Sequence, residues 1–586
     1  MVLLLGCQGR PPAALPEPRP FTHGVAVGDV TSDAAVIWTR AVTTADVTIT
    51  ISTDPQFTRV VLNATRLPDP LSDFTVKIDT RDLGPLSPGT RHYYHFESGD
   101  RRSRTGTFVT ASAPGQDTPV RFAFSGDAEG GTRPHSVLAT LAEEDLDFFV
   151  FLGDVIYADR PSPAGDEAKG LGEYRAKYRE LRERAVVGDP QFLLDAFAAT
   201  AFWTTIDDHE VVNDFAGGAV RGTDVRFADS AFVDPGRPPL INNTRRYAAG
   251  LRAFFEYMPV RDATVDAPDE PRSHGVPRLY RSFDWGRTAR FIMIDARSFR
   301  DAPIEAPLNP FDAAAAAAFW RDSADSTRTM LGCTQLAWLE DQLLTARDAG
   351  FVWVFIVNQE PIQNLSVLLA DDRWDGYLAE RNEILKFIAE HDIRNVVWLT
   401  TDIHVTLVND LHYVDDLAAH PTGIANPALR LPAAGSFEVV TGPIGFDPPT
   451  GVFIRPALAA VNLNLGFLMT TDGGMANALN NLLEDFGLDA LGLPPERVTI
   501  HVGSPDPRRA GVFDSYAYTV VEADTQQCTF TVRGIPAYTA DEAALAVSLA
   551  RLGWPDALNS ITRLRARDIY SFSVSAEPAA STALTP

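Results

Sequence analysis

The sequence predicts an α/β (α+β) core with layered β-sheets flanked by helices, preceded by an all-β sandwich of the immunoglobulin or fibronectin III kind. Residues 21–112 hold short runs rich in β-branched and aromatic residues, separated by turn residues. Beyond them, strand-like runs alternate with segments of helical periodicity, a pattern typical of parallel strands joined by helices. The 586 residues are too many for one ordinary domain. We therefore expect a tether at 1–20, the sandwich at 21–115 and the core at 116–586.

The expected strands of the sandwich are the runs "AAVIWTR", "DVTITIST", "FTVKIDT", "RHYYHFES" and "RTGTFVT". The Pro- and Gly-containing stretch "SAPGQDTP" (112–119) is the expected linker to the core. A strand at 120–127, helical periodicity at 135–145 and a second strand at 147–154 then form a βαβ unit. Later strands are expected near 201–208, 290–297, 351–359, 395–404, 436–442, 515–523 and 528–534, and helices near 313–318, 334–350 and 377–392. The segment 440–510 gives no assignment.

Composition excludes several classes of protein. With 45% hydrophobic and 22% charged residues the chain is typical of a folded globular protein. Its 51 basic and 77 acidic residues give a net charge of −26, which repels nucleic acids and anionic lipids, so no nucleic-acid-binding surface is expected. No apolar run approaches the ~20 residues of a transmembrane helix.

The N-terminus "MVLLLGCQGR" contains Leu4-Leu5-Gly6-Cys7, which looks like a bacterial lipobox. The apolar stretch is shorter than a signal peptide and has no basic start, so one interpretation is a lipoprotein signal truncated at its beginning. The alternative is a short apolar N-terminus with a chance cysteine. The first interpretation predicts an exported bacterial protein of the cell envelope or periplasm, lipid-anchored at Cys7. The other cysteines, Cys333 and Cys528, are expected to be core thiols, and a bridge between them stays open.

Polar side chains gather where the apolar strands of the core end. Ligands of open α/β sheets lie at the carboxyl ends of strands, and four of these ends offer acids, two of them with an imidazole, while a fifth offers amides. Such crowded acids would repel one another unless cations lie between them, and oxygen ligands favour hard ions such as Ca²⁺, Mg²⁺, Mn²⁺ or Fe³⁺. The strand ends are Asp127, Asp154, Asp207-Asp208-His209-Glu210, Asn358-Gln359 and Asp402-Ile403-His404.

The ordered motifs "SGD", "GDVIY", "DDHEVVND", "WDGY" and "TDIH" resemble the PhoD-like alkaline phosphatases, within the calcineurin-like metallophosphoesterases. The resemblance runs from "HGVAVGDVTSDAAVIWTR" to "TDIH", and more weakly to "SYAYTVVEA". It implies a metallophosphoesterase core behind a PhoD-type β-sandwich. It also implies two or more metal ions, with Fe³⁺ and Ca²⁺ expected first and Mn²⁺ or Mg²⁺ as alternatives.

The resemblance also implies roles for particular residues. Asp154 matches the carboxylate that bridges two metals, and Tyr157 matches a tyrosinate ligand of the first metal. Asp127 and His404 would complete that first site. Asp208 aligns with a ligand of the second metal, for which Asp402 and Gln359 are further candidates. The remaining candidates are Asp375 as a weaker metal ligand, Asn213 near the second metal or the substrate, His209 facing the leaving group, and Arg133 or Arg297 gripping phosphate.

The sequence departs from the family's pattern at two positions. Asp127 stands where the family often has cysteine. A carboxylate oxygen is a harder ligand than a thiolate, so the identity of the metal at the first site is open. Thr401 stands in "TTDIH" where glycine usually precedes Asp402. If the Thr401 side chain displaces this loop, the binding of the second metal would be weakened.

The resemblance implies hydrolysis of phosphate esters, monoesters or diesters, by a metal-activated hydroxide. One alternative is a phospholipase D-type phosphodiesterase, because lipid-cleaving relatives share the motif set. The other is an envelope-anchored binding protein with a degenerate metal site. Turnover of different phosphoesters discriminates among the three.

Overall fold

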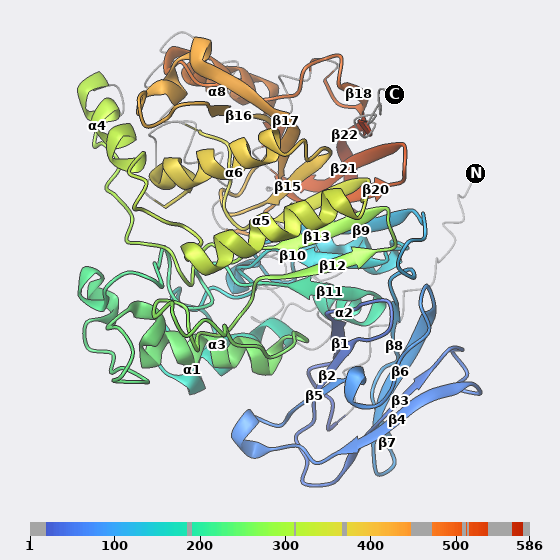
Figure 1. The fold of residues 1–586 in the computed structure, drawn as a ribbon. Helices are drawn as coiled ribbons and strands as arrows, with labels where there is room; N and C mark the ends of the chain where they lie inside the picture. Colours follow the sequence, from blue (N-terminus) through green and yellow to red (C-terminus); the bar gives the residue numbers. More distant parts are fainter. Residues whose placement is uncertain are drawn as a thin grey trace, which may run out of the picture.

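Two β-sheets packed face to face form the core of the protein, and helices cover both outer faces (Figure 1). This arrangement confirms the predicted class of layered sheets flanked by helices behind an all-β N-terminal region. The computed structural model describes residues 19–183, 190–309, 312–365, 372–446, 472–504, 506, 511–512, 515–536 and 565–577. Cys7 and most of the predicted tether lie outside these residues, so the lipid anchor stays a prediction.

The larger sheet has ten strands in the order β18-β22-β21-β20-β9-β10-β11-β1-β2-β5. Its central strands β9, β10 and β11 are parallel, as the predicted βαβ unit requires. Their residues are mostly apolar and buried, and Arg121 of β9 is the partly exposed exception. The strands are β1 (Val25–Gly28), β2 (Val36–Arg40), β5 (Thr75–Asp79), β9 (Val120–Ser125), β10 (Phe148–Phe151), β11 (Ala201–Thr204), β18 (Val498–Val502), β20 (Ser515–Ala523), β21 (Gln527–Pro536) and β22 (Arg567–Ser575).

The second sheet has seven strands in the order β12-β13-β14-β15-β17-β16-β19. Strands β13, β14, β15 and β17 are parallel, and β12 and β16 pair antiparallel with their neighbours. The strands are β12 (Arg281–Trp285), β13 (Ala289–Met293), β14 (Trp353–Val357), β15 (Val396–Thr400), β16 (Thr406–Val414), β17 (Arg430–Val440) and β19 (Gly511–Val512).

Aromatic side chains fill the space between the two sheets. Phe122 and Phe148 of the larger sheet meet the Phe291 ring edge-to-face at centroid distances of 5.1 and 5.2 Å. Phe291 stacks on Phe355 at 4.9 Å, and Trp203 stacks on Phe148 at 3.8 Å. Such pairs contribute about 0.5–1.5 kcal/mol each beyond their buried area, so they hold the two sheets together.

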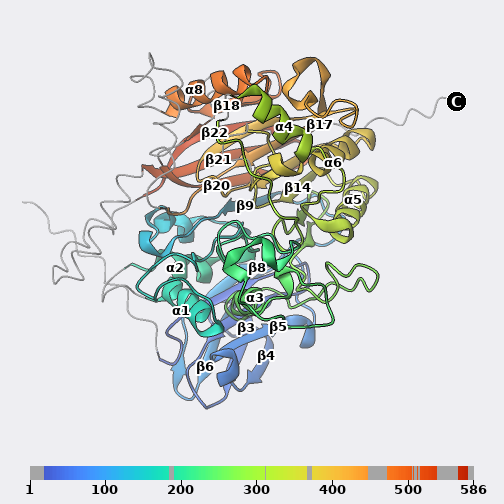
Figure 2. The same cartoon turned by 90° about the vertical axis from the view of Figure 1, so that its left-hand side faces the viewer.

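Helices α5 and α6 cover the outer face of the smaller sheet, where Figure 1 shows them side by side across its strands. The outer face of the larger sheet is covered by α1, α2 and α3, seen in Figure 2 below the level of β9. Asp312 caps the alanine-rich α4 by accepting hydrogen bonds from two backbone N–H groups. The helices are α1 (Leu171–Arg182), α2 (Phe192–Ala199), α3 (Arg245–Tyr257), α4 (Ala313–Ser323), α5 (Gly332–Asp348), α6 (Leu378–Glu390) and α8 (Asp472–Asp485).

The N-terminal region is less separate from the core than the sequence predicted. One layer of its sandwich is the sheet of β4, β3, β6 and β7 with β8 attached, seen in blue in Figure 1. The other layer, β1, β2 and β5, continues the ten-stranded sheet, because β1 pairs in parallel with β11. The predicted boundary at 115/116 therefore separates two parts of the chain that both contribute strands to the ten-stranded sheet. The strands of the first layer are β3 (Val47–Ser52), β4 (Val60–Arg66), β6 (Arg91–Ser98), β7 (Arg101–Arg102) and β8 (Gly106–Val109).

Three details differ from the sequence prediction. The helix expected at 135–145 is a 3₁₀ helix, η4 (Ser136–Glu143). The expectation of two core thiols is wrong for Cys333, which is exposed, whereas Cys528 is buried; both thiols are free, so they form no bridge. The unassigned segment 440–510 contributes α8 and β18. In the part of the chain that the structure describes, no helix is long and apolar enough to span a membrane.

Candidate metal centre

The site lies where parallel strands of both sheets end. The ends of β9, β10 and β11 present Asp127, Asp154 and the segment 207–210. Opposite them, the ends of β14 and β15 present the segments 358–360 and 401–404. Because the two sheets are packed face to face, segments far apart in the sequence converge at one edge of the molecule's core.

The loops at this edge have unusual backbone geometry. Asp127, Asp154, Asp402 and His404 all have left-handed φ angles, of 62°, 52°, 73° and 57°. Such conformations cost of order 1 kcal/mol or more and persist where surrounding structure enforces them. Gly153 has φ 106°, and a Cβ there would lie 2.3 Å from the backbone nitrogen of Asp207, so only glycine allows these two strand ends to approach.

Acidic and histidine side chains form a continuous row across the site, which we call the acidic row. It consists of four overlapping groups of three residues, and in each group one ligand atom per residue lies within 4.8 Å of the others. Asp154 belongs to the first two groups, Asp208 to the second and third, and Asp372 to the third and fourth. The groups are Asp127–Asp154–His404, Asp154–Asp208–His209, Asp208–Asp214–Asp372 and Glu360–Asp372–Asp402.

Tyr157 turns back toward the first group. Its hydroxyl lies 3.1 Å from Nε2 of His404, and that nitrogen lies 3.7 Å from Oδ1 of Asp127. The His404 ring stacks on Phe446 at a centroid distance of 3.7 Å. Burial, followed by the charges of His209 and Arg160, lowers the pKa of His404 to about 3, so its imidazole is neutral and able to act as a ligand.

The two positions that depart from the family's pattern contact each other. Thr401 Oγ1 donates a hydrogen bond of 2.5 Å to Oδ2 of Asp127. The other oxygen of Asp127, Oδ1, is buried with no hydrogen-bond partner. Thr401 therefore occupies one carboxylate oxygen and leaves the second directed toward the group that includes His404 and Asp154.

His209 is held by a second acid. Its Nδ1 lies 2.6 Å from Oδ1 of Asp159, and its ring lies 4.1 Å from that of Tyr157. Although burial alone would lower it, the carboxylates of Asp208 and Asp159 raise the pKa of His209 to about 9. Despite burial, the hydrogen bond with His209 lowers the pKa of Asp159 to about 2. The pair is therefore charged at neutral pH, with the imidazole as a proton donor.

Glu210 fixes the two loops to each other. Its carboxylate accepts hydrogen bonds from the backbone N–H groups of Val155 (2.7 Å), Asp207 (2.9 Å) and Asp154 (3.3 Å). The backbone N–H of His209 in turn donates to Oδ1 of Asp154 at 3.1 Å. The loop after β10 and the loop after β11 thus behave as one unit.

Arg297 supplies positive charge beneath the row. It is fully buried, and Asp207 Oδ1 and Glu360 Oε1 each lie 2.5 Å from its guanidinium. Arg300, also fully buried, pairs with Glu360 and Asp372. Within 4 Å of the Arg297 guanidinium lie the carboxylates of Asp207, Asp208, Glu360, Asp372 and Asp402.

Even with these arginines, the protein's own groups do not balance the acids. Burial chiefly, and then neighbouring carboxylates, raise the pKa of Asp127 to about 8 and that of Asp154 well above its usual range. The pKa values of Glu360 and Asp402 are also raised well above their usual range, first by burial. Asp127, Asp208 and Glu360 each keep one buried oxygen without a hydrogen bond. Unpaired buried oxygens in such a set fit hard cations.

Several sequence-predicted residues do not join the row. The Gln359 side chain is engaged by the N–H of Ala296, the carbonyl of Ile294 and Thr205. Asp375 belongs to none of the converging groups and lies beside Arg373.

Two of the predicted phosphate-gripping or substrate-contacting residues are also placed differently. Arg133 is buried and ties its loop to α1 through Glu180, and Arg297 is enclosed by carboxylates. Asn213 lies near the row, where its backbone N–H donates to Asp159 and its side chain to Asp214.

Sequence reasoning missed Asp159, Asp214, Glu360 and Asp372. Asp159 ends the stretch "GDVIYAD", and a carboxylate that follows a strand-end motif by a few residues was the available signal. Glu360 directly follows the amide pair after β14. Asp372 lies on no regular element, and no local pattern identifies it.

The chain matches two family models. That of PhoD-like phosphatases matches residues 124–453, and that of the N-terminal domain of PhoD-like phosphatases matches residues 7–112. Because the first match covers more than half of the 586 residues, the chain belongs to the PhoD-like phosphatase family.

Individual relatives agree with this assignment. Alkaline phosphatase D of Bacillus subtilis (strain 168) is 30% identical over 428 residues, which cover 67% of this chain and 66% of that protein, just under two thirds of its length. Purple acid phosphatase 21 of Arabidopsis thaliana is 31% identical over 103 residues, 18% of this chain and 22% of that protein. The solved structure of PhoD has the same fold, with a TM-score of 0.64 at 22% identity over 95% of this chain and 91% of that one.

Proposed function

We propose that the protein is a metal-dependent phosphoesterase that hydrolyses phosphate esters at the acidic row. The observation that carries the proposal is the position of Asp154. Its carboxylate belongs to two adjacent ligand groups and is buried, with its pKa raised by burial and by neighbouring acids. A carboxylate in this position is suited to two cations at once, and paired cations suit phosphoryl transfer.

Asp127, Asp154, Tyr157 and His404 would hold the first cation. A second cation would be held by Asp154 and Asp208, together with Asp372 and Asp402 farther along the acidic row. When bound, such cations polarise phosphoryl oxygens and make water a nucleophile near neutral pH. Ferric iron at the first position and Ca²⁺ at the second are the ions we propose, because the available donors are carboxylate and phenol oxygens with one imidazole.

The protein's own groups supply the proton transfer and the positioning. His209, protonated and oriented by Asp159, is placed to donate a proton to the departing alkoxide. Glu210 holds the backbone of Asp154 and Asp207 in register, so the two ends of the row keep their spacing. Arg297 and Arg300 offset part of the negative charge beneath the row. Bound cations would supply the remaining positive charge that an anionic substrate needs in a protein of net charge −26.

The test is turnover of p-nitrophenyl phosphate, bis-p-nitrophenyl phosphate and phosphatidylcholine before and after treatment with a chelator. We expect cleavage of at least one nitrophenyl ester, lost on chelation and restored by added metal. Cleavage of phosphatidylcholine in preference to both would favour the phospholipase-type alternative. Full metal occupancy without turnover of any phosphoester would favour the binding protein and overturn the proposal.

The role of Tyr157 has its own test. Burial and the nearby carboxylates raise its pKa well above the usual range, so its phenol loses the proton only to a strongly acidic cation. We expect iron-loaded protein to be coloured by phenolate-to-iron charge transfer, and Tyr157→Phe to remove the colour and weaken iron binding. A visible spectrum beside an iron assay decides it. A coloured Tyr157→Phe variant, or colourless iron-loaded wild type, would mean that the phenol is not a ligand.

The contact between Thr401 and Asp127 predicts coupling between the two positions. Thr401→Gly removes the hydrogen bond that occupies Asp127 Oδ2, and Asp127→Cys removes its acceptor. Residues in direct contact generally show interaction energies of about 0.5–3 kcal/mol, so the double variant should retain the first metal better than the sum of the single effects predicts. Metal content of the four proteins measures this. Additive losses would mean that the hydrogen bond has no part in shaping the site.

A further inference from the structure

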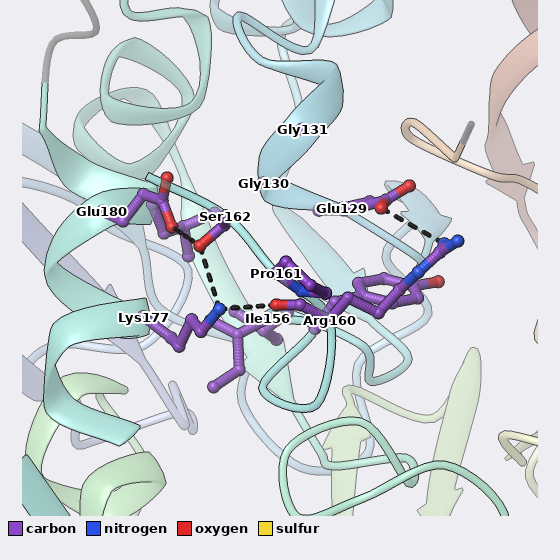
Figure 3. Close-up of a pocket in the computed structure, with 13 residues that line it drawn as sticks. Glu129, Gly130, Gly131, Ile156, Arg160, Pro161, Ser162, Lys177 and Glu180 are labelled. Atoms are coloured by element: carbon purple, nitrogen blue, oxygen red, sulfur yellow. Dashed lines mark hydrogen bonds and ion pairs between the residues drawn. The ribbon is translucent and has the colours of Figure 1, made fainter. Parts of the chain in front are cut away.

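Arg160 lies at the rim of the acidic row, in a pocket that its neighbours Glu129 and Tyr157 also line (Figure 3). It follows the strand-end loop that carries Asp154, Tyr157 and Asp159. The arginines considered above, Arg133 and Arg297, are buried and enclosed by protein acceptors, whereas the Arg160 side chain keeps 36% of its surface exposed. The positive charge of Arg160 also contributes to lowering the pKa of His404, so the two side chains lie close to each other.

The backbone beside Arg160 is firmly held. Lys177, which is 4% exposed, donates to the carbonyl of Arg160 (2.6 Å), to Oγ of Ser162 (2.9 Å) and to the carbonyl of Gly165 (2.8 Å). Ser162 in turn donates to Glu180 at 2.5 Å, and Figure 3 shows this network beneath the loop. The main chain at Arg160 is therefore fixed, and movement is left to the side chain.

The guanidinium of Arg160 is positioned but incompletely bonded. It lies 4.8 Å from the ring centroid of Phe446 and 6.0 Å from that of Tyr157, which favours a cation over these rings. Its Nη1 lies 3.2 Å from Oε1 of Glu129, yet it is buried and makes no hydrogen bond. An ion pair without a formed hydrogen bond leaves donor capacity for an arriving anion.

From this arrangement we propose that Arg160 binds the phosphoryl group of the substrate, and that it makes the site selective for phosphomonoesters. The guanidinium leaves Glu129 and donates to a non-bridging phosphoryl oxygen, while Phe446 and Tyr157 keep it at the rim. Glu129 holds it in place between turnovers. The inference rests on the proposed phosphoesterase function and adds the substrate class to it.

The charge of the substrate gives the selectivity. A phosphomonoester carries nearly two negative charges at neutral pH or above, whereas a phosphodiester carries one and has one fewer free oxygen. A planar guanidinium binds two oxygens of one phosphate group, and its attraction grows with the charge of that group. The Glu129 carboxylate opposes both substrates, so removing it should favour the more highly charged one.

The experiment compares Arg160→Gln and Glu129→Gln with wild type in metal-replete buffer. It measures kcat/KM for p-nitrophenyl phosphate and bis-p-nitrophenyl phosphate, and the affinity for inorganic phosphate by calorimetry. We expect Arg160→Gln to weaken phosphate binding by about tenfold or more and to lower kcat/KM for the monoester more than for the diester. Glu129→Gln should tighten phosphate binding. Arg287→Gln is the matched control, because it removes an arginine from an exposed ion pair with Asp117 just before β13, at the opposite ends of the strands.

Unchanged phosphate affinity in Arg160→Gln, or equal losses for the two esters, would overturn the inference. Weaker phosphate binding in Glu129→Gln would also contradict it, because Glu129 would then support the anion rather than oppose it. If wild type cleaves neither ester, the proposed function fails, and the phosphate affinities still decide whether Arg160 binds the anion.

Discussion

Replacing Asp154 by alanine should remove both bound metal and turnover. The carboxylate lies in two adjacent ligand groups, so its loss takes a ligand from both at once. The fold should survive, because Asp154 accepts one backbone hydrogen bond of 3.1 Å and its removal lessens repulsion among buried acids. We expect metal content to fall below one ion per chain and turnover to fall by several orders of magnitude, as it does when a group essential to the chemistry is removed. Metal analysis, turnover and a thermal melt measure the outcome.

Asp147→Asn is the matched control for this variant. Asp147 is a partly buried aspartate whose pKa is raised to about 6, chiefly by burial, and it lies just before β10, at the opposite end of the same strand. Its Oδ2 accepts from the backbone N–H of Arg121, a bond that an asparagine oxygen can also accept. The control should keep wild-type metal and activity. A folded Asp154→Ala protein with the metal and turnover of wild type would contradict the assignment of the site.

Replacing His209 by asparagine should slow the hydrolysis of alkyl phosphates far more than that of nitrophenyl phosphates. A general acid contributes typically ~10²–10⁴-fold, and its contribution matters most when the leaving oxygen is basic. We expect a loss in this range for an alkyl phosphate and a much smaller loss for p-nitrophenyl phosphate. Kinetics with both substrates at saturating metal provide the measurement.

Asp159→Asn provides a graded comparison, because it keeps the imidazole and removes the carboxylate that raises its pKa. This variant should also lose more activity on alkyl phosphates than on nitrophenyl phosphates, but both losses should be smaller than those of His209→Asn. Equal losses on good and poor leaving groups in His209→Asn would instead assign His209 to metal or phosphate positioning.

The parallel strands β10, β11, β13, β14 and β15 could be predicted from the sequence because each is a short, buried run of mostly apolar residues. The pairing of β1 with β11 could not, because only one residue pair, Gly28 with Phe202, carries the junction between regions far apart in sequence. The run at 135–145 has helical periodicity but closes as a 3₁₀ helix. Periodicity near 3.6 does not distinguish the two over so short a segment.

At the site, residues adjacent to a strand-end motif could be predicted, and residues on irregular segments could not. Asp154 and Asp208 lie in the loops just beyond the apolar strands β10 and β11, so their position in the sequence marked them as strand-end acids. For Gln359 the sequence could not show that the side chain hydrogen-bonds backbone groups, among them the N–H of Ala296, because a strand-end amide can serve either as a ligand or as a backbone partner. The pairing of Thr401 with Asp127 was hidden because 274 positions separate them and nothing in the local sequence couples them.

We have proposed that the acidic row holds two or more cations and that these cations make the protein a phosphoesterase. Metal analysis of protein purified without chelator, with turnover of p-nitrophenyl phosphate measured on the same sample, tests it most directly. We expect two or more tightly held ions per chain, iron among them, and activity that is lost when the metal is removed and returns when it is replaced. Active protein with less than one ion per chain, or activity that survives complete removal of metal, would contradict it.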